Sequence, residues 1–274
     1  MDKAVNMSNS DADYLDVLLA AIRVSHDYRP KFGRGGRVGL TLDEFSKLYQ
    51  GDAFYGWFGL DDPMMYAAHK AAGGMTSVYR QIGIGVERLF RKILMDSLGL
   101  ALADVKWSYE VTSAAGRKRR LHLDGRVPLG SIEKDKDRAR FHVWMKRVAA
   151  DLDVDKDVFG SLKGAVFEVR QGYKSKDSKR QNADISNASV AYTKGYLPCA
   201  VILSGQIDSD VLVRYSAAKW AVLTGTVGGD DSLRSTYDFS REVLGYDLAA
   251  FFQRNSDELR QEVHSVLTNL LAPS

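Results

Sequence analysis

The sequence predicts a mixed α/β fold, an α+β arrangement in which a central sheet of about four or five strands is flanked by helices. Residues 105–111 and 117–124 have the pattern of two strands joined by a turn, which predicts a hairpin. Residues 164–170 and 198–204 are apolar strands with a helical segment between them, which is typical of a strand–helix–strand crossover. We expect a single domain over residues 1–274, with its core at about 76–204, an N-terminal helical or arm region at 1–75 and a C-terminal helical layer at 205–274.

Composition and charge exclude several protein classes. The chain has 274 residues, of which 45% are hydrophobic and 27% charged, and these values are ordinary for a globular protein. No apolar run approaches the roughly 18–20 residues that span a bilayer, and residues 1–16 lack the apolar stretch of a signal peptide. The single cysteine, Cys199, excludes an internal disulfide. We therefore expect a cytoplasmic protein that has no membrane partner.

The N-terminal region begins with a predicted helix at residues 11–24, in which apolar side chains recur at helical spacing. Residues 29–39 follow, with four basic residues, no acidic residue and several glycines. This composition favours a flexible loop or arm. Three interpretations are open: a solvated loop, a basic arm that meets a polyanion, or a phosphate-binding loop that lacks the usual Gly-Lys-Ser/Thr ending.

Two more helices are predicted before the core. Residues 41–49 form a short helix that Thr41 caps, with Glu44 three positions later. Residues 76–98 carry the clearest apolar stripe of the chain. Between them lies an aromatic cluster, for which core packing is favoured over base stacking; its members are Tyr55, Trp57 and Phe58.

The second half of the chain alternates helices with the two apolar strands. The charged segment 133–152 is a predicted helix with a solvated face, because its acids and bases largely cancel. Residues 178–192 are the crossover helix. The last helices are expected at 208–219, 232–244 and 257–271.

Two acidic residues of the core are candidates for chemistry. Asp124 ends the second strand, and Glu168 lies inside the apolar third strand, where a carboxylate is costly unless it is paired or binds a metal. If these strands pair, Asp124 and Glu168 converge on one divalent ion, and oxygen ligands suit Mg²⁺. The alternative is a structural salt bridge between Glu168 and Arg170, whose side chains share a face of the strand.

A basic, amide-rich segment follows Glu168. Residues 170–180 carry five positive residues and one acid. Arginine, lysine, asparagine and glutamine are the side chains that read base edges and phosphates. Candidate DNA contacts are Tyr173, Lys174, Lys176, Asp177, Ser178, Lys179, Arg180, Gln181 and Asn182, with Arg117 and Arg119 of the hairpin as a second basic cluster.

This arrangement resembles the PD-(D/E)xK nucleases, and specifically the type II restriction endonucleases. The residues that carry the resemblance are Glu87 on an early helix, Asp124 at a strand end and Glu168-Val169-Arg170 on the next strand. The resemblance covers about residues 76–204 and implies a restriction-endonuclease-like core with helical additions at both ends. It also implies that Asp124 and Glu168 bind Mg²⁺, that Glu87 acts from its helix, and that the protein is a homodimer cutting double-stranded DNA at a specific sequence.

The chain departs from this family's pattern at two positions. Asp124 is not preceded by proline, and Arg170 stands where the family has lysine. Arginine stays protonated and cannot be a general base, but it could orient the attacking water or stabilise the phosphate. Lys174 is the second candidate for this role.

Two other functions remain open on the sequence. A non-catalytic nucleic-acid-binding protein with a degenerate nuclease fold is supported by Arg170 in place of lysine. A DNA repair or antiphage nuclease would use the same residues in another biological setting.

Overall fold

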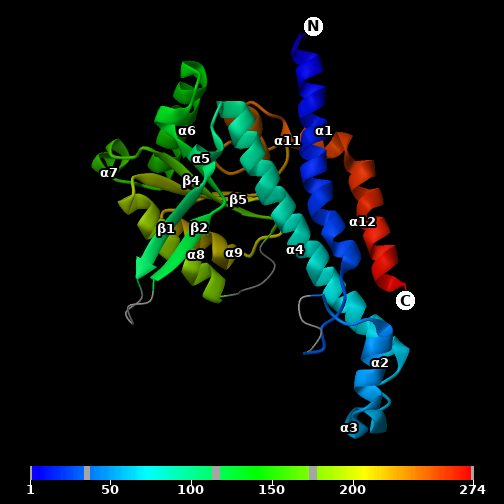
Figure 1. Cartoon of the computed structure of the whole chain (residues 1–274). Helices are drawn as coiled ribbons and strands as arrows, with labels where there is room; N and C mark the ends of the chain where they lie inside the picture. The colour runs from blue at the N-terminus through cyan, green and yellow to red at the C-terminus, as the bar shows by residue number, and fades with distance from the viewer. Residues whose placement is uncertain (1, 34–37, 113–117, 173–177, 273–274) are drawn as a thin grey trace. The chain divides into compact units, whose positions relative to one another are not determined.

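The computed structural model describes residues 2–33, 38–112, 118–172 and 178–272. The chain divides into two compact units, which are described separately. The helical unit consists of Met1–Gly85 and Arg254–Ser274, and the sheet unit consists of Val86–Gln253 (Figure 1). Helices and a mixed sheet occur together, so the predicted α/β class is confirmed.

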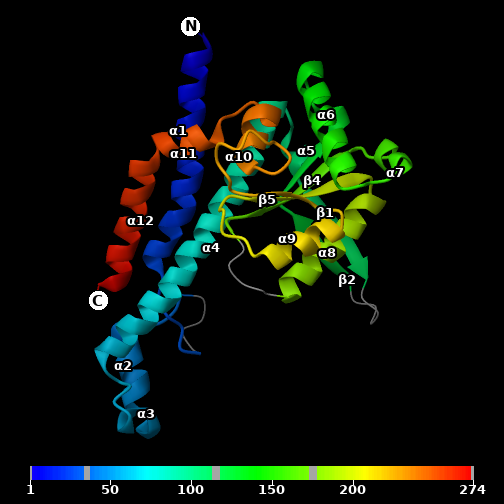
Figure 2. The ribbon, with the colours of Figure 1, turned by 180° about the vertical axis from the view of Figure 1, so that it is seen from behind.

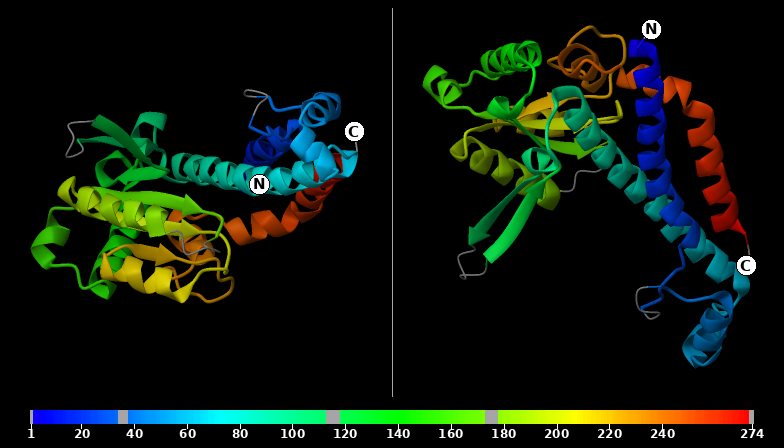
Figure 3. Two further views of the ribbon diagram at one scale, coloured as in Figure 1. Left: turned by 90° about the horizontal axis from the view of Figure 1, so that it is seen from below. Right: turned by 45° about the horizontal axis from the view of Figure 1, so that its top comes forward.

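The helical unit is built on three helices that pack along one another. They are α1 (Asp2–Arg23), the N-terminal part of α4 (Pro63–Leu98) and α12 (Ser256–Leu271) (Figure 3). Their shared buried cluster contains Ile22, Val78, Val266 and Leu270. Burial of such side chains is worth roughly 1.5–3 kcal/mol each, so this seam holds the two ends of the chain together.

Helices α2 (Leu42–Gln50) and α3 (Ala53–Trp57) complete the helical unit. Thr41 accepts the backbone N–H of Glu44 while the Glu44 carboxylate accepts the N–H of Thr41, so the predicted capping box is confirmed. The prediction that the nearby aromatic cluster packs into the core is wrong. Trp57 is 81% exposed and Phe58 is 67% exposed. Helix α3 has only five residues and buries none of them.

The sheet unit contains a four-stranded sheet and a separate hairpin. The sheet order is β3 (Gly125–Pro128), β4 (Gly164–Arg170), β5 (Tyr196–Ile202) and β6 (Ala221–Leu223). Strand β3 is antiparallel to β4, while β4, β5 and β6 are mutually parallel neighbours. The hairpin pairs β1 (Trp107–Thr112) with β2 (Lys118–Leu123). The crossover from β4 to β5 runs through α8 (Ser178–Thr193), as predicted.

Both faces of the sheet are covered. On one face, α8, α9 (Ser209–Ala217) and the hairpin enclose a buried cluster with β4, β5 and β6 (Figure 2). On the other face, the ring of Phe167 meets aromatic rings from α4, α6 (Asp135–Asp151) and α10 (Thr236–Phe239). Successive residues of β4 therefore face different layers, because side chains alternate along a strand.

Several predicted boundaries are wrong. The second predicted strand is β2, which ends at Leu123, beside the predicted end at Asp124. The chain then continues into β3, which was not predicted, and it is β3 rather than β2 that pairs with β4. Val105 belongs to the short helix α5 (Leu102–Val105) rather than to a strand. Helix α4 begins at Pro63, thirteen residues before the predicted start at Thr76, and runs through Gly73 and Gly74. Strand β6 was not predicted.

The remaining elements connect these layers. The segment predicted as one helix at 232–244 is α10 followed by the π-helical turn η3 (Ser240–Leu244). The others are η1 (Val24–Asp27), η2 (Leu129–Ser131), α7 (Lys156–Gly160) and α11 (Leu248–Arg254). Among the described residues, no helix combines the length and the hydrophobicity that a membrane span requires.

Candidate functional site

Asp124 lies at the one-residue break between β2 and β3, where it is fixed by two hydrogen bonds to β4. Its backbone N–H donates to the carbonyl of Phe167 at 2.8 Å, and its Oδ2 accepts the N–H of Val169 at 2.8 Å. Gly125 pairs in register with Phe167, so the next position, Asp124, lies beside Glu168. The structure brings these two predicted residues together, although through β3 rather than through the expected strand.

Glu168 is a buried carboxylate in the middle of the sheet. It is 6% exposed and pairs in register with Ala200 of β5. Its side chain forms an ion pair with Arg170, and both side chains are nearly enclosed, at 8% and 11% exposed. The salt bridge that the sequence allowed as an alternative to a metal site is therefore formed.

Helix α4 presents its last turns to the same region. The Nε of Arg91 donates to the backbone carbonyl of Asp124 at 2.9 Å. Glu87 lies one turn earlier on α4 and is half-buried; residues four positions apart share a helix face. Glu87 consequently lies on the same side of α4 as Arg91.

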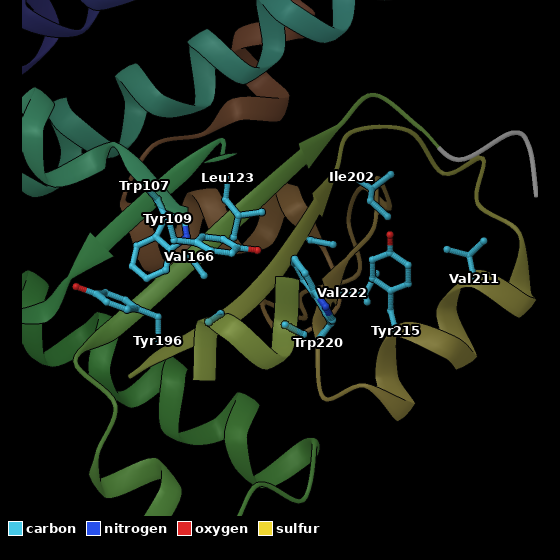
Figure 4. Close-up of a cluster of buried hydrophobic side chains, with 13 residues drawn as sticks. Trp107, Tyr109, Leu123, Val166, Tyr196, Ile202, Val211, Tyr215, Trp220 and Val222 are labelled. Carbon is cyan, nitrogen blue, oxygen red and sulfur yellow. The ribbon is translucent and has the colours of Figure 1, made fainter. Parts of the chain in front are cut away.

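Two polar residues near Glu168 were missed from the sequence. Tyr109 of β1 and Asn187 of α8 are each 8% exposed, and the Tyr109 hydroxyl donates to Oδ1 of Asn187. Figure 4 shows Tyr109 among apolar side chains of the hairpin and the sheet, beside Val166 and Leu123. Burial and, to a smaller extent, the charge of Glu168 raise the pKa of Tyr109. The phenol therefore stays a protonated donor at neutral pH.

The signals that could have revealed this pair are weak. Tyr109 shares the period-2 pattern of its strand with Trp107, which indicates a half-buried strand but no polar site. Asn187 stands next to Ala188 and four positions before Ala191, both fully buried. A polar residue at a buried position of a helix was the only indication.

Five of the eleven predicted DNA contacts lie outside what the structure describes, and the others are described only at the backbone. Residues 113–117 and 173–177 are not described, so Arg117, Tyr173, Lys174, Lys176 and Asp177 lie outside the described residues. Ser178 opens α8 and is followed on its first turns by the other predicted contacts, for which only the backbone is described; these are Lys179, Arg180, Gln181 and Asn182. Arg119 is likewise a backbone position of β2.

A second group of carboxylates belongs to α10, η3 and the segment just before them. Asp230, Asp238 and Glu242 have side-chain oxygens within 4.8 Å of one another. The guanidinium of Arg241 contacts all three, at 2.7, 3.0 and 3.2 Å. The protein's own cation therefore already occupies this cluster and offsets one of its three negative charges, and we assign no metal to it.

The site around Asp124 combines carboxylates with a guanidinium. Two carboxylates on adjacent strands supply oxygen ligands of the type that Mg²⁺ prefers, and a carboxylate has enough lone pairs to contact a guanidinium and a cation at once. The donor types are those that Mg²⁺ takes, while Glu168 is also engaged by Arg170. Arg170 adds a permanent positive charge next to the same carboxylates, where it can contact a phosphate.

The comparisons with known proteins identify no relative. No protein-family model matches the chain, and no curated protein or solved structure is significantly similar to it.

Proposed function

We propose that this protein is a Mg²⁺-dependent endonuclease that hydrolyses phosphodiester bonds of double-stranded DNA at a specific sequence, in the manner of type II restriction endonucleases. One observation carries the proposal: Asp124 is anchored to the Val169 N–H, directly beside Glu168. Two carboxylates held on rigid neighbouring strands are a common basis for metal-assisted hydrolysis.

Asp124 and Glu168 would hold the ion, which activates water and stabilises charge on the phosphate when it is bound. Arg170 would contact the phosphate and orient the attacking water, since its guanidinium cannot accept a proton. Glu87 would act from α4 on the ordering of that water, because Arg91 of the same helix face contacts Asp124. The hydrogen bond between Tyr109 of β1 and Asn187 of α8 would fix the hairpin and α8 against the face of β4 that carries Glu168.

The DNA would be recognised by the segment that joins β4 to α8 and by the first turns of α8. This segment is rich in lysine, arginine and amide side chains, and such side chains contact phosphates and base edges. A homodimer is part of the proposal, because two-fold symmetric proteins match two-fold symmetric DNA sites.

A second function is favoured by the ion pair between Arg170 and Glu168. The arginine neutralises the carboxylate that the metal would need, as expected for a nucleic-acid-binding protein with a degenerate nuclease fold. Replacement of Arg170 separates the two functions, since Arg170→Lys restores the residue that is typical of active nucleases.

The experiment is cleavage of supercoiled plasmid with and without Mg²⁺. We expect Mg²⁺-dependent discrete fragments from the wild-type protein, and a loss of rate of at least about 100-fold in Asp124→Asn and Glu168→Gln, the size of effect seen when one electrostatic group of an active site is removed. Glu110→Gln is the matched control, because Glu110 is an exposed carboxylate on β1. Plasmid that is retarded but uncut by the wild type and by Arg170→Lys would establish the binding protein instead.

A further inference from the structure

Three aromatic side chains of α3 form an exposed apolar surface in the helical unit, here called the aromatic patch. Its members Phe54, Trp57 and Phe58 are spaced three and four positions apart, so they share one face of the helix. The rings of Phe54 and Phe58 contact each other, with centroids 5.2 Å apart, yet all three side chains remain exposed. Exposed apolar side chains that gather in one place are typical of interaction sites, whereas scattered ones need no explanation.

The fold holds the aromatic patch in a fixed orientation. Asp52 caps the first turn of α3. The helix ends in a tight turn at Gly59, where φ is 64° and the N–H of Leu60 donates to the carbonyl of Tyr55 at 3.0 Å. The ring of Tyr55 stacks on that of Tyr49 of α2, with centroids 4.8 Å apart. The patch is therefore preorganised, which lowers the entropic cost of binding a partner.

Negative charge flanks the aromatic patch, although the whole chain has a net charge of +3. Residues 42–62 carry five acids and one base, a net charge of −4. Asp52 stands directly before α3, and Asp61 and Asp62 follow the turn that ends it. Asp52 also lines, with Glu44 and two leucines, a groove of about 590 Å³ along α2. This surface thus offers apolar rings and carboxylates together.

The charge of this segment decides among the candidate occupants. A nucleic acid and an anionic membrane are both negatively charged, so the carboxylates repel them. A second copy in a two-fold interface would bring the same patch against itself. Two segments of net charge −4 would then face each other, and such like-charge contacts disfavour association. A partner with cationic side chains is attracted instead.

We propose that the aromatic patch binds a basic, apolar segment of a partner protein. Apolar side chains of this segment pack on the three rings, and its lysine or arginine side chains face the carboxylates at both ends of α3. Cations also bind to aromatic faces, and tryptophan is among the residues that contribute most to the affinity of protein interfaces. The surface belongs to the helical unit, so it does not depend on the proposed nuclease chemistry.

The first experiment measures the binding of labelled synthetic peptides to the full chain by anisotropy. One peptide has leucine at helical spacing and lysine elsewhere, the second has glutamate in place of lysine, and the third has serine in place of leucine. We expect the leucine–lysine peptide to bind most tightly and to lose affinity as salt is added, because salt screens exposed charges. Its binding should also shift tryptophan emission to shorter wavelength, since Trp57 is exposed and the other three tryptophans are buried.

Variants test the apolar and the charged part of the surface separately. Trp57→Ser should weaken binding of the leucine–lysine peptide roughly tenfold or more. Leu271→Ser is the matched control, because it removes an exposed apolar side chain of α12 and should leave binding unchanged. The variant Asp52→Asn/Asp61→Asn/Asp62→Asn should weaken binding and flatten its salt dependence. Asparagine keeps the capping acceptors of Asp52 and Asp62, so the helices stay capped.

Other occupants of the aromatic patch would be revealed by the same variants. Failure of the wild type to bind the leucine–lysine peptide, or equal binding by Trp57→Ser, would overturn the proposal. A sedimentation mass of two chains that falls to one chain in Trp57→Ser would assign the patch to a second copy instead. Binding of a labelled single-stranded oligonucleotide that is lost in Trp57→Ser would assign it to base stacking, which also contradicts the proposal.

Discussion

At the residue scale, the bond between Tyr109 and Asn187 is the clearest polar contact next to Glu168. Both side chains are buried, so removing one partner leaves the other without a donor or an acceptor. Tyr109→Phe should lower the free energy of unfolding by about 1–3 kcal/mol. Urea denaturation measures this value.

The double variant Tyr109→Phe/Asn187→Leu provides the control. It removes both polar partners, so we expect it to be more stable than the sum of the two single changes predicts. Strict additivity of the two losses would show that the pair does not act as a unit.

The residues of the candidate site differ in how well the sequence reveals them. Glu168 and Arg170 were recognisable because charged residues are rare inside an apolar strand. Tyr109 and Asn187 were not, because a tyrosine in an alternating strand and an asparagine on a polar helix are both ordinary. Their burial follows from tertiary packing, which the local pattern does not contain.

At the element scale, the pairing of β3 with β4 requires a glycine. A Cβ built at Gly164 would lie 1.9 Å from the backbone carbonyl oxygen of Val127 on β3, so the two strands would have to separate. Gly164→Ala should destabilise the protein by about 1–3 kcal/mol or more. Gly160 is the matched control, since nothing lies within 4 Å of a Cβ at that position; equal melting temperatures of Gly164→Ala and Gly160→Ala would contradict the strand pairing.

Helix α4 offers a second test through its glycines. A Cβ at Gly83 would meet nothing within 4 Å, whereas one at Gly74 would lie 2.6 Å from Cδ2 of the buried Leu270. Gly83→Ala should stabilise the protein by about 0.5–1 kcal/mol, because alanine loses less backbone entropy in a helix. Gly74→Ala should destabilise it. Denaturant midpoints compare the two, and a gain in both would show that α12 does not pack on α4 at Gly74.

Element boundaries differ in how well the sequence predicts them. Strand β4 was predicted at its exact limits, because an apolar run between glycine and a charged residue marks a buried strand. The start of α4 was missed, because its glycines resemble a loop; Gly73 is explained by the close approach of the Tyr28 ring and Gly74 by that of Leu270 on α12. Strand β6 has three residues, too few for any periodicity.

At the scale of the whole molecule, stability should decrease in alkaline solution. Burial raises the pKa of Cys199, Tyr192 and Tyr237, so each holds its proton more tightly when folded than when unfolded. This stability is fully present below the unfolded pKa values, about 8.5 for cysteine and 10 for tyrosine, and is lost as the pH rises above them.

Urea denaturation between pH 8 and pH 10.5 measures this loss. Above the unfolded pKa, each group contributes a slope of up to about 1.4 kcal/mol per pH unit. Tyr192→Phe should flatten the curve, because it removes one of these groups. A free energy of unfolding that stays constant to pH 10.5 would contradict the burial of these side chains.

The break at Asp124 also determines where the chain can change in length. The hairpin pairs β1 with residues up to Leu123, before Asp124, and the sheet pairs β4 with residues from Gly125 onward. Equal extensions of β1 and β2 would therefore leave the carboxylate of Asp124 beside Glu168. One residue inserted between Asp124 and Gly125 would shift the aspartate away from the Val169 N–H, because a one-residue slip turns side chains to the opposite face of a strand. Insertions made equally in β1 and β2 therefore leave Asp124 in place, whereas a single insertion beside Asp124 does not.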